Sequence, residues 1–413
     1  MPRWSDYTTG ERIKILRGKD IRQSDLSAMT GLSLPTVQQA EQDKRLTLQT
    51  LMKVADALGV DTSVILGQQA PRRAMEQDDR AMMRALSRAV HDTAAGMLPD
   101  TVTAPSLETL SETTDRCWDL YWQGGYVEAG ALAAPLIAEA SARLHDQPAD
   151  SQAVAWSTVA DAYRLAGYVA NLMGSRDLAY AAIGHAQNAA AQAADGMRSA
   201  LVMSGRSWIY LRDARLTEAL RLAEMAATDI EPRFSKATPD ELVAYGSHIN
   251  FAAVVASRMG NKELVRDYLS QSHATGARMG TEHKAHGTLF GPVTATTQAV
   301  GINVALGQTG KALTLMEDIK PVHEAALSGA ARNRYQMDKA MAQADAKMWD
   351  ASLDTLEGAL LAAPEWARHQ ALPSVIVQRV GKASTARLRR VSELIGVSPG
   401  ASGFLPATAK TAL

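Results

Sequence analysis

The chain has 413 residues, a formal net charge of −1 and 46% hydrophobic against 21% charged residues. This length predicts two or more domains, and no apolar run approaches the ~20 residues that a membrane-spanning helix needs. The single cysteine, Cys117, excludes an intramolecular disulfide. Because the first residues also do not resemble a secretory signal, we expect a cytoplasmic protein without a membrane partner.

Residues 22–45 are the most informative stretch, because two short helices are predicted on either side of Gly31. Glycine suits the positive-φ position after a helix. Ser33 can cap the second helix by accepting the amide of Thr36, and proline is tolerated in a first turn. The side chains expected to hold the two helices together are Leu26, Met29, Leu32 and Val37. This is a helix-turn-helix arrangement, whose second helix fits the major groove of DNA.

Helical periodicity continues on both sides of this motif. An apolar stripe of Ile13, Ile15 and Leu16 precedes it, and a periodic pattern over 48–58 stops at Gly59. Residues 9–67 therefore form about five short helices, within a domain of residues 1–68. They resemble the Cro/phage-repressor (XRE) family of helix-turn-helix transcription regulators.

The resemblance assigns roles to individual positions. In this family a Gln at the position of Gln23 binds the DNA backbone, exposed residues of the third helix face bases, and an Arg–Glu pair matches Arg17 and Glu41. A Gln amide can pair with adenine in a bidentate manner, which favours Gln38 and Gln39 as base readers. The predicted DNA-binding residues are Arg22, Gln23, Ser24, Leu34, Pro35, Thr36, Gln38, Gln39, Lys44 and Arg45.

Basic residues gather around this motif although the whole chain is nearly neutral. They are Arg12, Lys14, Arg17, Lys19 and Arg22 before it, and Lys44 and Arg45 after it. A focused basic patch on a neutral protein is compatible with specific recognition of double-stranded DNA.

Residues 69–105 read as a linker with one connecting helix. Pro71 breaks the preceding helix, whereas 76–95 has helical periodicity with an apolar side. This helix and the late repeats are the segments expected to supply the contact between two chains.

Residues 106–396 read as helix after helix, with turns at nearly regular places. Turns are predicted at 123–126, 173–176, 213–215, 259–262, 307–310 and 347–350. The period implies about six helical hairpins and resembles the tetratricopeptide repeat, in units longer than usual. Small residues such as Ala160, Ala166, Ala179 and Ala219 are what close helix packing requires. The fold class is therefore all-α, with an α-solenoid after the five-helix domain and a flexible tail at 397–413.

Signals for chemistry are weak. The stretch Gly307–Lys311 lacks the spacing of a phosphate loop. Glu282, His283 and His286 lack metalloprotease spacing and read as a polar inter-repeat loop, and Cys117 reads as a core residue. We expect no enzyme, cofactor or metal.

A helix-turn-helix domain joined to such repeats resembles peptide-responsive regulators of Gram-positive bacteria, where the repeat groove binds a signalling peptide in quorum sensing. It also resembles uncharacterised actinobacterial regulators, which share the helix entry Phe290-Gly291-Pro292. We expect a homodimer on a palindromic operator that senses a peptide or small-molecule effector. The alternative is a scaffold that tethers a protein partner at DNA. The candidate ligand-binding residues, each with an alternative role in inter-repeat hydrogen bonding, are Arg206, Tyr210, Asn250, Asn303 and Arg334.

Overall fold

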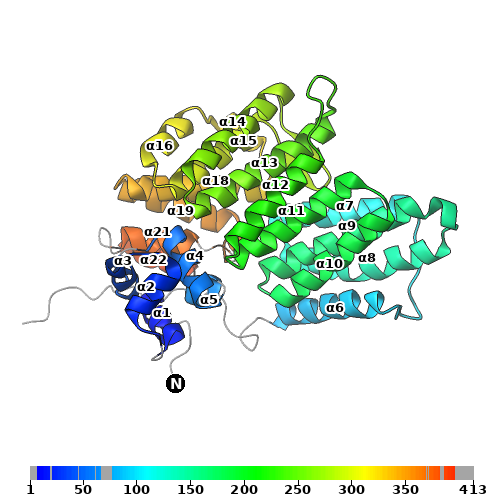
Figure 1. Cartoon of the computed structure of the whole chain (residues 1–413), viewed down its shortest axis with the longest axis horizontal. Coiled ribbons are helices and arrows are strands. Elements are labelled where there is room, and N and C mark those ends of the chain that lie inside the picture. Colours follow the sequence, from blue (N-terminus) through cyan, green and yellow to red (C-terminus); the bar gives the residue numbers. More distant parts are fainter. Residues whose placement is uncertain are drawn as a thin grey trace, which may run out of the picture.

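The computed structural model describes residues 7–18, 21–44, 46–60, 62–66, 77–368, 370, 372–381 and 386–395. Helices follow one another along nearly all of these ranges (Figure 1), and the strands within them are one short pair. This confirms the predicted all-α class, with a small N-terminal helical domain followed by a solenoid of antiparallel helix pairs.

The N-terminal domain contains the five expected helices, whose ends are set by local capping. They are α1 (Thr9–Arg17), α2 (Gln23–Thr30), α3 (Leu34–Glu41), α4 (Leu48–Ala57) and α5 (Thr62–Leu66). α2 ends at Gly31, which has a φ of +63°. The Ser33 hydroxyl accepts a hydrogen bond from the Thr36 amide (3.3 Å) at the start of α3, as predicted. Each helix contributes to one core, through Ile13, Leu26, Val37, Leu51, Val54 and Ile65.

Two residues expected in this core lie on the surface instead. Met29 is 53% exposed and Ile15 is 48% exposed. α2 buries Leu26 and Thr30, which are one turn apart, and the Thr30 hydroxyl donates to the Leu26 carbonyl (2.7 Å). Because these two residues occupy the inner side of a short helix, Met29 falls on its flank.

The connecting helix α6 (Gln77–Ala94) packs along the solenoid. Its apolar residues Met82, Leu86 and Val90 are buried in the core of the repeat domain. Gly130 on α8 leaves just enough room for the Met82 side chain. This apolar side was one of the two surfaces expected to join two chains, and its own chain already covers it.

The repeat domain consists of helices paired across tight turns. The first pairs are α7 (Leu107–Gln123) with α8 (Tyr126–Asp146), α9 (Gln152–Leu172) with α10 (Arg176–Gln192), and α11 (Gly196–Arg212) with α12 (Leu216–Asp229). The next are α13 (Pro239–Met259) with α14 (Lys262–Met279), α15 (Pro292–Ala305) with α16 (Thr309–Glu317), and α18 (Gly329–Asp345) with α19 (Trp349–Ala362). Shorter elements complete the described chain: η3 (Ala149–Ser151), α17 (Pro321–Ala325), α20 (Pro364–Arg368), α21 (Leu372–Val380) and α22 (Ala386–Leu394).

All six predicted turns fall between the two helices of a pair. Each turn contains one residue with positive φ: Gly124, Gly174, Ala214, Gly260, Gly307 and Lys347. A left-handed residue after a helix lets the chain reverse within a few residues. The predicted tail at 397–413 lies outside the described residues.

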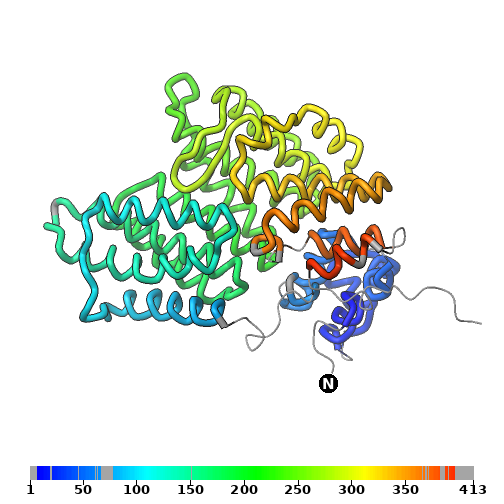
Figure 2. Tube along the Cα trace, turned by 180° about the vertical axis from the view of Figure 1, so that it is seen from behind, coloured from blue at the N-terminus to red at the C-terminus, as the bar shows by residue number. Residues whose placement is uncertain are grey.

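Alanine lets the helices of this domain approach closely. Ala160, Ala166, Ala179 and Ala219 have no exposed surface, in agreement with their predicted role. The stack curves so strongly that its two ends meet (Figure 2), with α7 against α18 and α20. At this contact a Cβ on Gly124 would lie 2.9 Å from Cβ of Trp366. The two ends of the stack are therefore in direct contact.

A β-hairpin between α14 and α15 replaces the polar loop expected there. β1 (His283–Ala285) pairs antiparallel with β2 (Thr288–Phe290). His286 and Gly287 form the turn with φ of +51° and +72°, the two left-handed residues of a tight hairpin turn. Phe290 is fully buried at the base of the hairpin, against Val243 on α13.

Replacing Gly246 by alanine should destabilise the repeat domain. A Cβ at this position on α13 would clash with the Phe290 ring. Overpacking of this kind costs about 1–3 kcal/mol, and urea unfolding followed by circular dichroism measures it. The matched control is Gly358→Ala in the middle of α19, where no atom lies within 4 Å of the added methyl. The control should stabilise the helix by about 0.5–1 kcal/mol, and equal effects of the two changes would contradict the clash.

Candidate nucleic-acid interface

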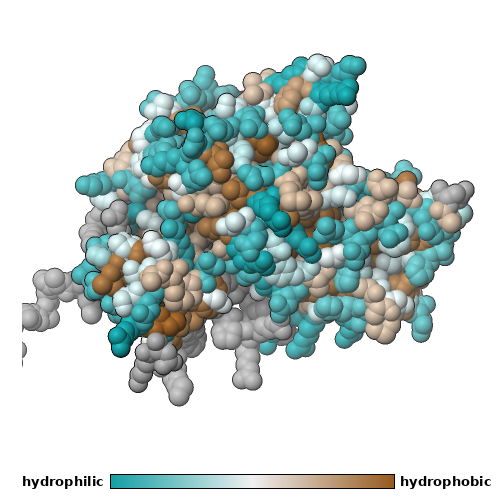
Figure 3. All heavy atoms as spheres, viewed as in Figure 1, coloured by the Kyte–Doolittle hydropathy of each residue, from teal (hydrophilic) through white to brown (hydrophobic). Residues whose placement is uncertain are grey.

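The outer side of α3 carries side chains that no neighbouring helix covers. Leu34, Pro35 and Gln39 are exposed, and Thr36 and Gln38 are half-buried. Figure 1 places α3 at the outer edge of the N-terminal domain. In Figure 3 this domain is the lobe at the lower left, where polar and apolar residues both reach the surface. α3 is therefore free to enter a groove of DNA.

Glu41, the last residue of α3, is the buried centre of a polar network that joins three helices. Its side chain is 1% exposed, and its Oε1 lies 2.6 Å from Nε of Arg17 on α1. Its Oε2 accepts a hydrogen bond from Nε2 of Gln23 on α2 (2.6 Å). The Gln23 carbonyl in turn accepts from the side-chain amide of Gln38 (3.4 Å). The expected pairing of Arg17 with Glu41 is confirmed, and it extends to a residue predicted to read bases.

This network changes the expectation for Gln23. Both ends of its side-chain amide are engaged, one by Glu41 and the other by Gln38. A phosphate contact made by this side chain would have to replace one of those bonds. The network therefore places Gln23 as a support of α3.

A close contact between α1 and α3 fixes the recognition helix further. Asp43 follows α3 with a φ of +55°, and its Oδ1 accepts the Gly10 amide (2.8 Å). A Cβ on Gly10 would clash with the Glu41 backbone carbonyl. α3 is thus held at its C-terminal end by both backbone and side-chain contacts.

The basic residues around the motif divide into two groups. Lys14, Arg22 and Lys44 are exposed and can reach phosphates. Arg12 is an exception to the predicted patch, because it is 5% exposed and donates to the Ile65 carbonyl (3.2 Å). Burial lowers the pKa of its guanidinium.

Ser24, another predicted DNA-binding residue, is exposed, and its hydroxyl donates a hydrogen bond to the Asp25 carboxylate (3.3 Å). Lys19 and Arg45 lie outside the described residues.

Comparison with known families agrees with this geometry. Residues 13–67 match the Cro/C1-type helix-turn-helix DNA-binding domain. The chain thus carries the DNA-binding domain of a transcription regulator, which favours regulation over catalysis. No curated protein and no solved structure matched the chain.

The Cro/C1-type domain contacts the repeat domain through α1 and α4. Met52 on α4 is 7% exposed and joins the apolar cluster that contains Leu211 and Val255. Gln49 lies against the turn at Gly260, between α13 and α14. On the other side, Gln378 on α21 donates to the Thr9 hydroxyl (2.8 Å). We call these contacts the seat, and the seat leaves the recognition helix uncovered.

Like charges meet at one side of the seat. Asp56 at the end of α4 faces Asp213 and Glu218, which lie at the turn between α11 and α12. Partial burial and these two carboxylates raise the pKa of Asp56. The three carboxylates therefore repel one another weakly at neutral pH, because Asp56 is exposed to solvent.

The predicted ligand-binding residues on α11 face the neighbouring repeat. The Tyr210 ring lies 5.7 Å from the ring of Tyr180 on α10. Arg206 is directed at the same helix, near Gly184, and its Nε has no hydrogen-bond partner. These two residues share one side of α11, as the four-residue spacing predicted.

The other three predicted ligand-binding residues are engaged in separate contacts. Asn250 accepts a hydrogen bond from Ser272 on α14 (3.3 Å). Asn303 donates to a carbonyl of its own helix, and Arg334 pairs with Asp338 one turn away (3.1 Å). Each of these three side chains thus already has a partner within the chain.

Two inward arginines are features that sequence reasoning missed. The Arg212 guanidinium lies 6.0 Å from the Trp208 ring, and its buried Nε has no hydrogen-bond partner. Burial lowers the pKa of Arg212. Arg258 is 7% exposed, and burial followed by repulsion from Arg334 lowers its pKa to about 10. A basic residue in the last turn of a helix is common, so the sequence carries no signal that distinguishes these two.

The described ranges contain no cluster of three or more His, Cys, Asp or Glu side chains suited to a metal ion. None of their helices has the length and apolar character that a bilayer crossing requires. Cys117 is fully buried, as predicted, and burial raises the pKa of its thiol to about 11.

Glu41→Ala should destabilise the Cro/C1-type domain by about 3 kcal/mol, because Arg17 would keep its charge in a mostly buried site without a carboxylate. Hydrogen exchange of the α1–α3 amides in the full chain measures this opening free energy. Glu41→Gln preserves the shape and should cost less. Unchanged exchange in both variants would show that the network contributes nothing to stability.

Asp56→Asn should raise the melting temperature at pH 7, with a gain below about 1 kcal/mol because the site is exposed. The folded-state pKa of Asp56 lies above its unfolded value, so stability falls as pH rises between these two values and the full penalty remains above them. The gain from Asp56→Asn should accordingly vanish when thermal unfolding is measured below about pH 4. An equal gain in stability at both pH values would show that removal of the Asp56 charge is not its cause.

Proposed function

We propose that the chain regulates transcription by binding an operator through α3. Gln39 is exposed beside Gln38, and Gln38 is oriented by Gln23, which Glu41 holds from the core. The oriented Gln38 and the exposed Gln39 carry the proposal, because a Gln amide can pair with adenine in a bidentate manner. Exposed Lys44 is suited to hold a phosphate, which adds affinity without sequence information.

The working form in this proposal is a homodimer on a palindromic operator. One Cro-type domain covers few base pairs, and a two-fold pair of recognition helices spans about one DNA turn, roughly 34 Å. The seat leaves α3 free in each chain, so dimerisation through the repeat domain is compatible with binding. With the apolar side of α6 covered, the late repeats are the remaining candidate for this contact.

The repeat domain, which we assign to the tetratricopeptide-like type, senses an anionic peptide or small molecule in this proposal. Arg212 offers a half-buried cation with an unpaired Nε beside an aromatic ring, and Arg206 on the same helix also has an unpaired Nε. Arg212 directly precedes Asp213, one of the two carboxylates that face Asp56 across the seat. A bound anion would change the field at the seat, and operator and effector affinities would then be linked reciprocally.

Gln39→Ala should weaken binding to the operator by about 1–3 kcal/mol, roughly 5- to 150-fold, and leave binding to unrelated DNA unchanged. The operator is first obtained by sequencing the genomic fragments that the protein retains. Fluorescence anisotropy then measures both affinities at one salt concentration, because phosphate contacts depend on salt.

Gln42→Ala is the matched control, because Gln42 is also exposed but follows the last residue of α3 as its C-cap. It should leave both affinities unchanged. Equal losses on operator and unrelated DNA after Gln39→Ala would overturn base reading by α3. If a protein partner instead co-purifies in stoichiometric amount without any small ligand, the result would support the alternative function, a scaffold that tethers this partner at DNA.

A further inference from the structure

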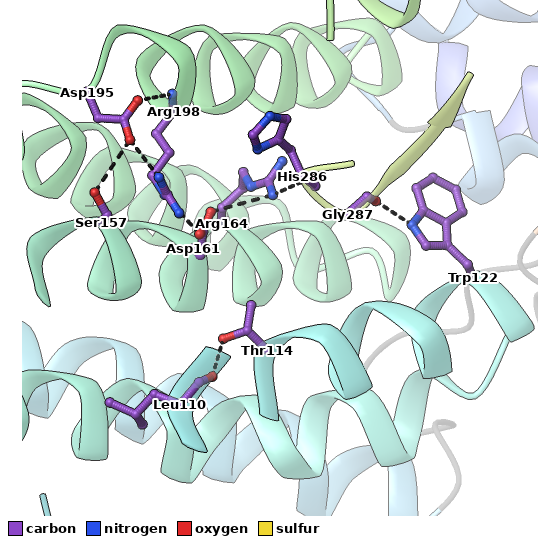
Figure 4. Close-up of polar contacts among 10 residues, drawn as sticks. All are labelled: Leu110, Thr114, Trp122, Ser157, Asp161, Arg164, Asp195, Arg198, His286 and Gly287. Atoms are coloured by element: carbon purple, nitrogen blue, oxygen red, sulfur yellow. Dashed lines mark hydrogen bonds and ion pairs between the residues drawn. The ribbon is translucent and has the colours of Figure 1, made fainter. Parts of the chain in front are cut away.

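The tip of the β-hairpin contacts helices that are distant from it in the sequence. Its base rests on α13, and its turn meets the first two helix pairs (Figure 4). The indole Nε1 of Trp122 on α7 donates to the Gly287 carbonyl (2.6 Å). Nη2 of Arg164 on α9 donates to the His286 carbonyl (2.8 Å). Two successive backbone carbonyls are thus bound by side chains more than a hundred residues away.

The surface under the tip contacts backbone atoms of the hairpin and leaves no room for a side chain at Gly287. The Arg164 guanidinium lies 4.6 Å from the Trp118 ring, and Gly287 lies on the same ring. A Cβ on Gly287 would come within 2.8 Å of that ring, so only glycine fits. We call Trp118, Trp122 and Arg164 the tip site.

The Arg164 guanidinium is held in place by charge. It lies 3.5 Å from Asp161, which also pairs with Arg198 (2.9 Å), and Arg198 pairs with Asp195 (2.6 Å). Arg164 is 4% exposed, and its Nε has no hydrogen-bond partner. Without the hairpin, Nη2 of Arg164 would lose the His286 carbonyl and keep only the 3.5 Å contact with Asp161, which favours the binding of another acceptor.

The hairpin is fixed at its base and held by polar contacts at its tip. At the base, Glu282 caps α15 by accepting the amides of Val293 (2.8 Å) and Thr294 (3.2 Å), and Phe290 is fully buried. Towards the tip, the turn residues His286 and Gly287 are only partly buried, and Lys284 forms an exposed ion pair with Asp119. The tip is therefore held by partly exposed contacts, whereas the base belongs to the core.

We propose that the hairpin is a built-in occupant of the tip site, and that a peptide offering two successive carbonyls in a glycine turn displaces it. This inference rests on the proposed effector sensing and assigns a peptide effector to the tip site, apart from the anion contacts proposed at Arg206 and Arg212. Detachment would release α13 from the α7 and α9 pairs. Because α4 of the Cro/C1-type domain rests on α13, the seat would change with it.

The test uses the hairpin itself as the probe, as a fluorescein-labelled peptide of residues 281–291. In the intact chain the tethered hairpin has an effective concentration in the millimolar range, so the labelled peptide should not compete at micromolar concentration. Gly287→Ala in the full chain forces the tip away from Trp118 and should bind the peptide at least tenfold more tightly than wild type. Anisotropy measures the affinity.

The control is Gly307→Ala, which has a similar φ of +70° but no atom within 4 Å of the added methyl. It carries the same backbone strain and should not bind the peptide. Adding Trp122→Phe to Gly287→Ala removes one donor and should weaken peptide binding roughly 3- to 10-fold. Equal binding to wild type and Gly287→Ala, or binding that survives Trp122→Phe unchanged, overturns the proposal.

If Gly287→Ala fails to fold, the single variant Trp122→Phe tests the proposal instead. Hydrogen exchange of residues 283–290 should then accelerate at unchanged helix content, and unchanged exchange overturns the proposal. These measurements contain no DNA, so their failure leaves operator binding by α3 untouched. Loss of operator binding by Gln39→Ala, conversely, says nothing about the tip site.

Discussion

Close approach of helices at small residues is the constraint on which the repeat domain depends. Gly167 on α9 shows how tight the contact is, because an added Cβ would lie 2.7 Å from the Ile183 side chain on α10. Interiors packed at this density transmit a change in one spacing to the next pair. The curvature that brings Gly124 to Trp366 is the sum of these spacings, and the hairpin tip binds to helices α7 and α9 of the same curved stack.

In the Cro/C1-type domain, stability and recognition rest on the same buried carboxylate. Burying the Glu41 charge is unfavourable unless hydrogen bonds and a countercharge compensate it, and Arg17 and Gln23 supply both. The same Gln23 orients Gln38. The hydrogen bonds that compensate the buried Glu41 charge therefore also set the orientation of a side chain on α3.

Much of this fold could be predicted because its signals are local. Helix caps, glycine turns and apolar periodicity act over a few residues, so the helix-turn-helix and all six repeat turns were found from the sequence alone. The candidate DNA-facing side of α3 followed from the same spacing. The burial of Arg12 under the Ile65 carbonyl did not, because no short pattern records that a helix 50 residues later offers an acceptor.

The contacts of the hairpin tip could not be predicted from the sequence, for the same reason. The tip of the hairpin is defined by Trp122 and Arg164, and a polar stretch containing two histidines resembles an ordinary loop until those partners are known. The exposed position of Met29 has a different cause, since an eight-residue helix has room for only one inward row and Thr30 takes part of it.

The burial of Cys117 has a practical consequence. It is the single cysteine of the chain, it has no exposed surface, and its raised pKa keeps the thiol protonated. A maleimide or spin label added to the native protein will therefore react almost only at a cysteine introduced on the surface. One such residue beside α3 would report the position of the DNA-binding domain against the repeats, without any prior removal of a native thiol.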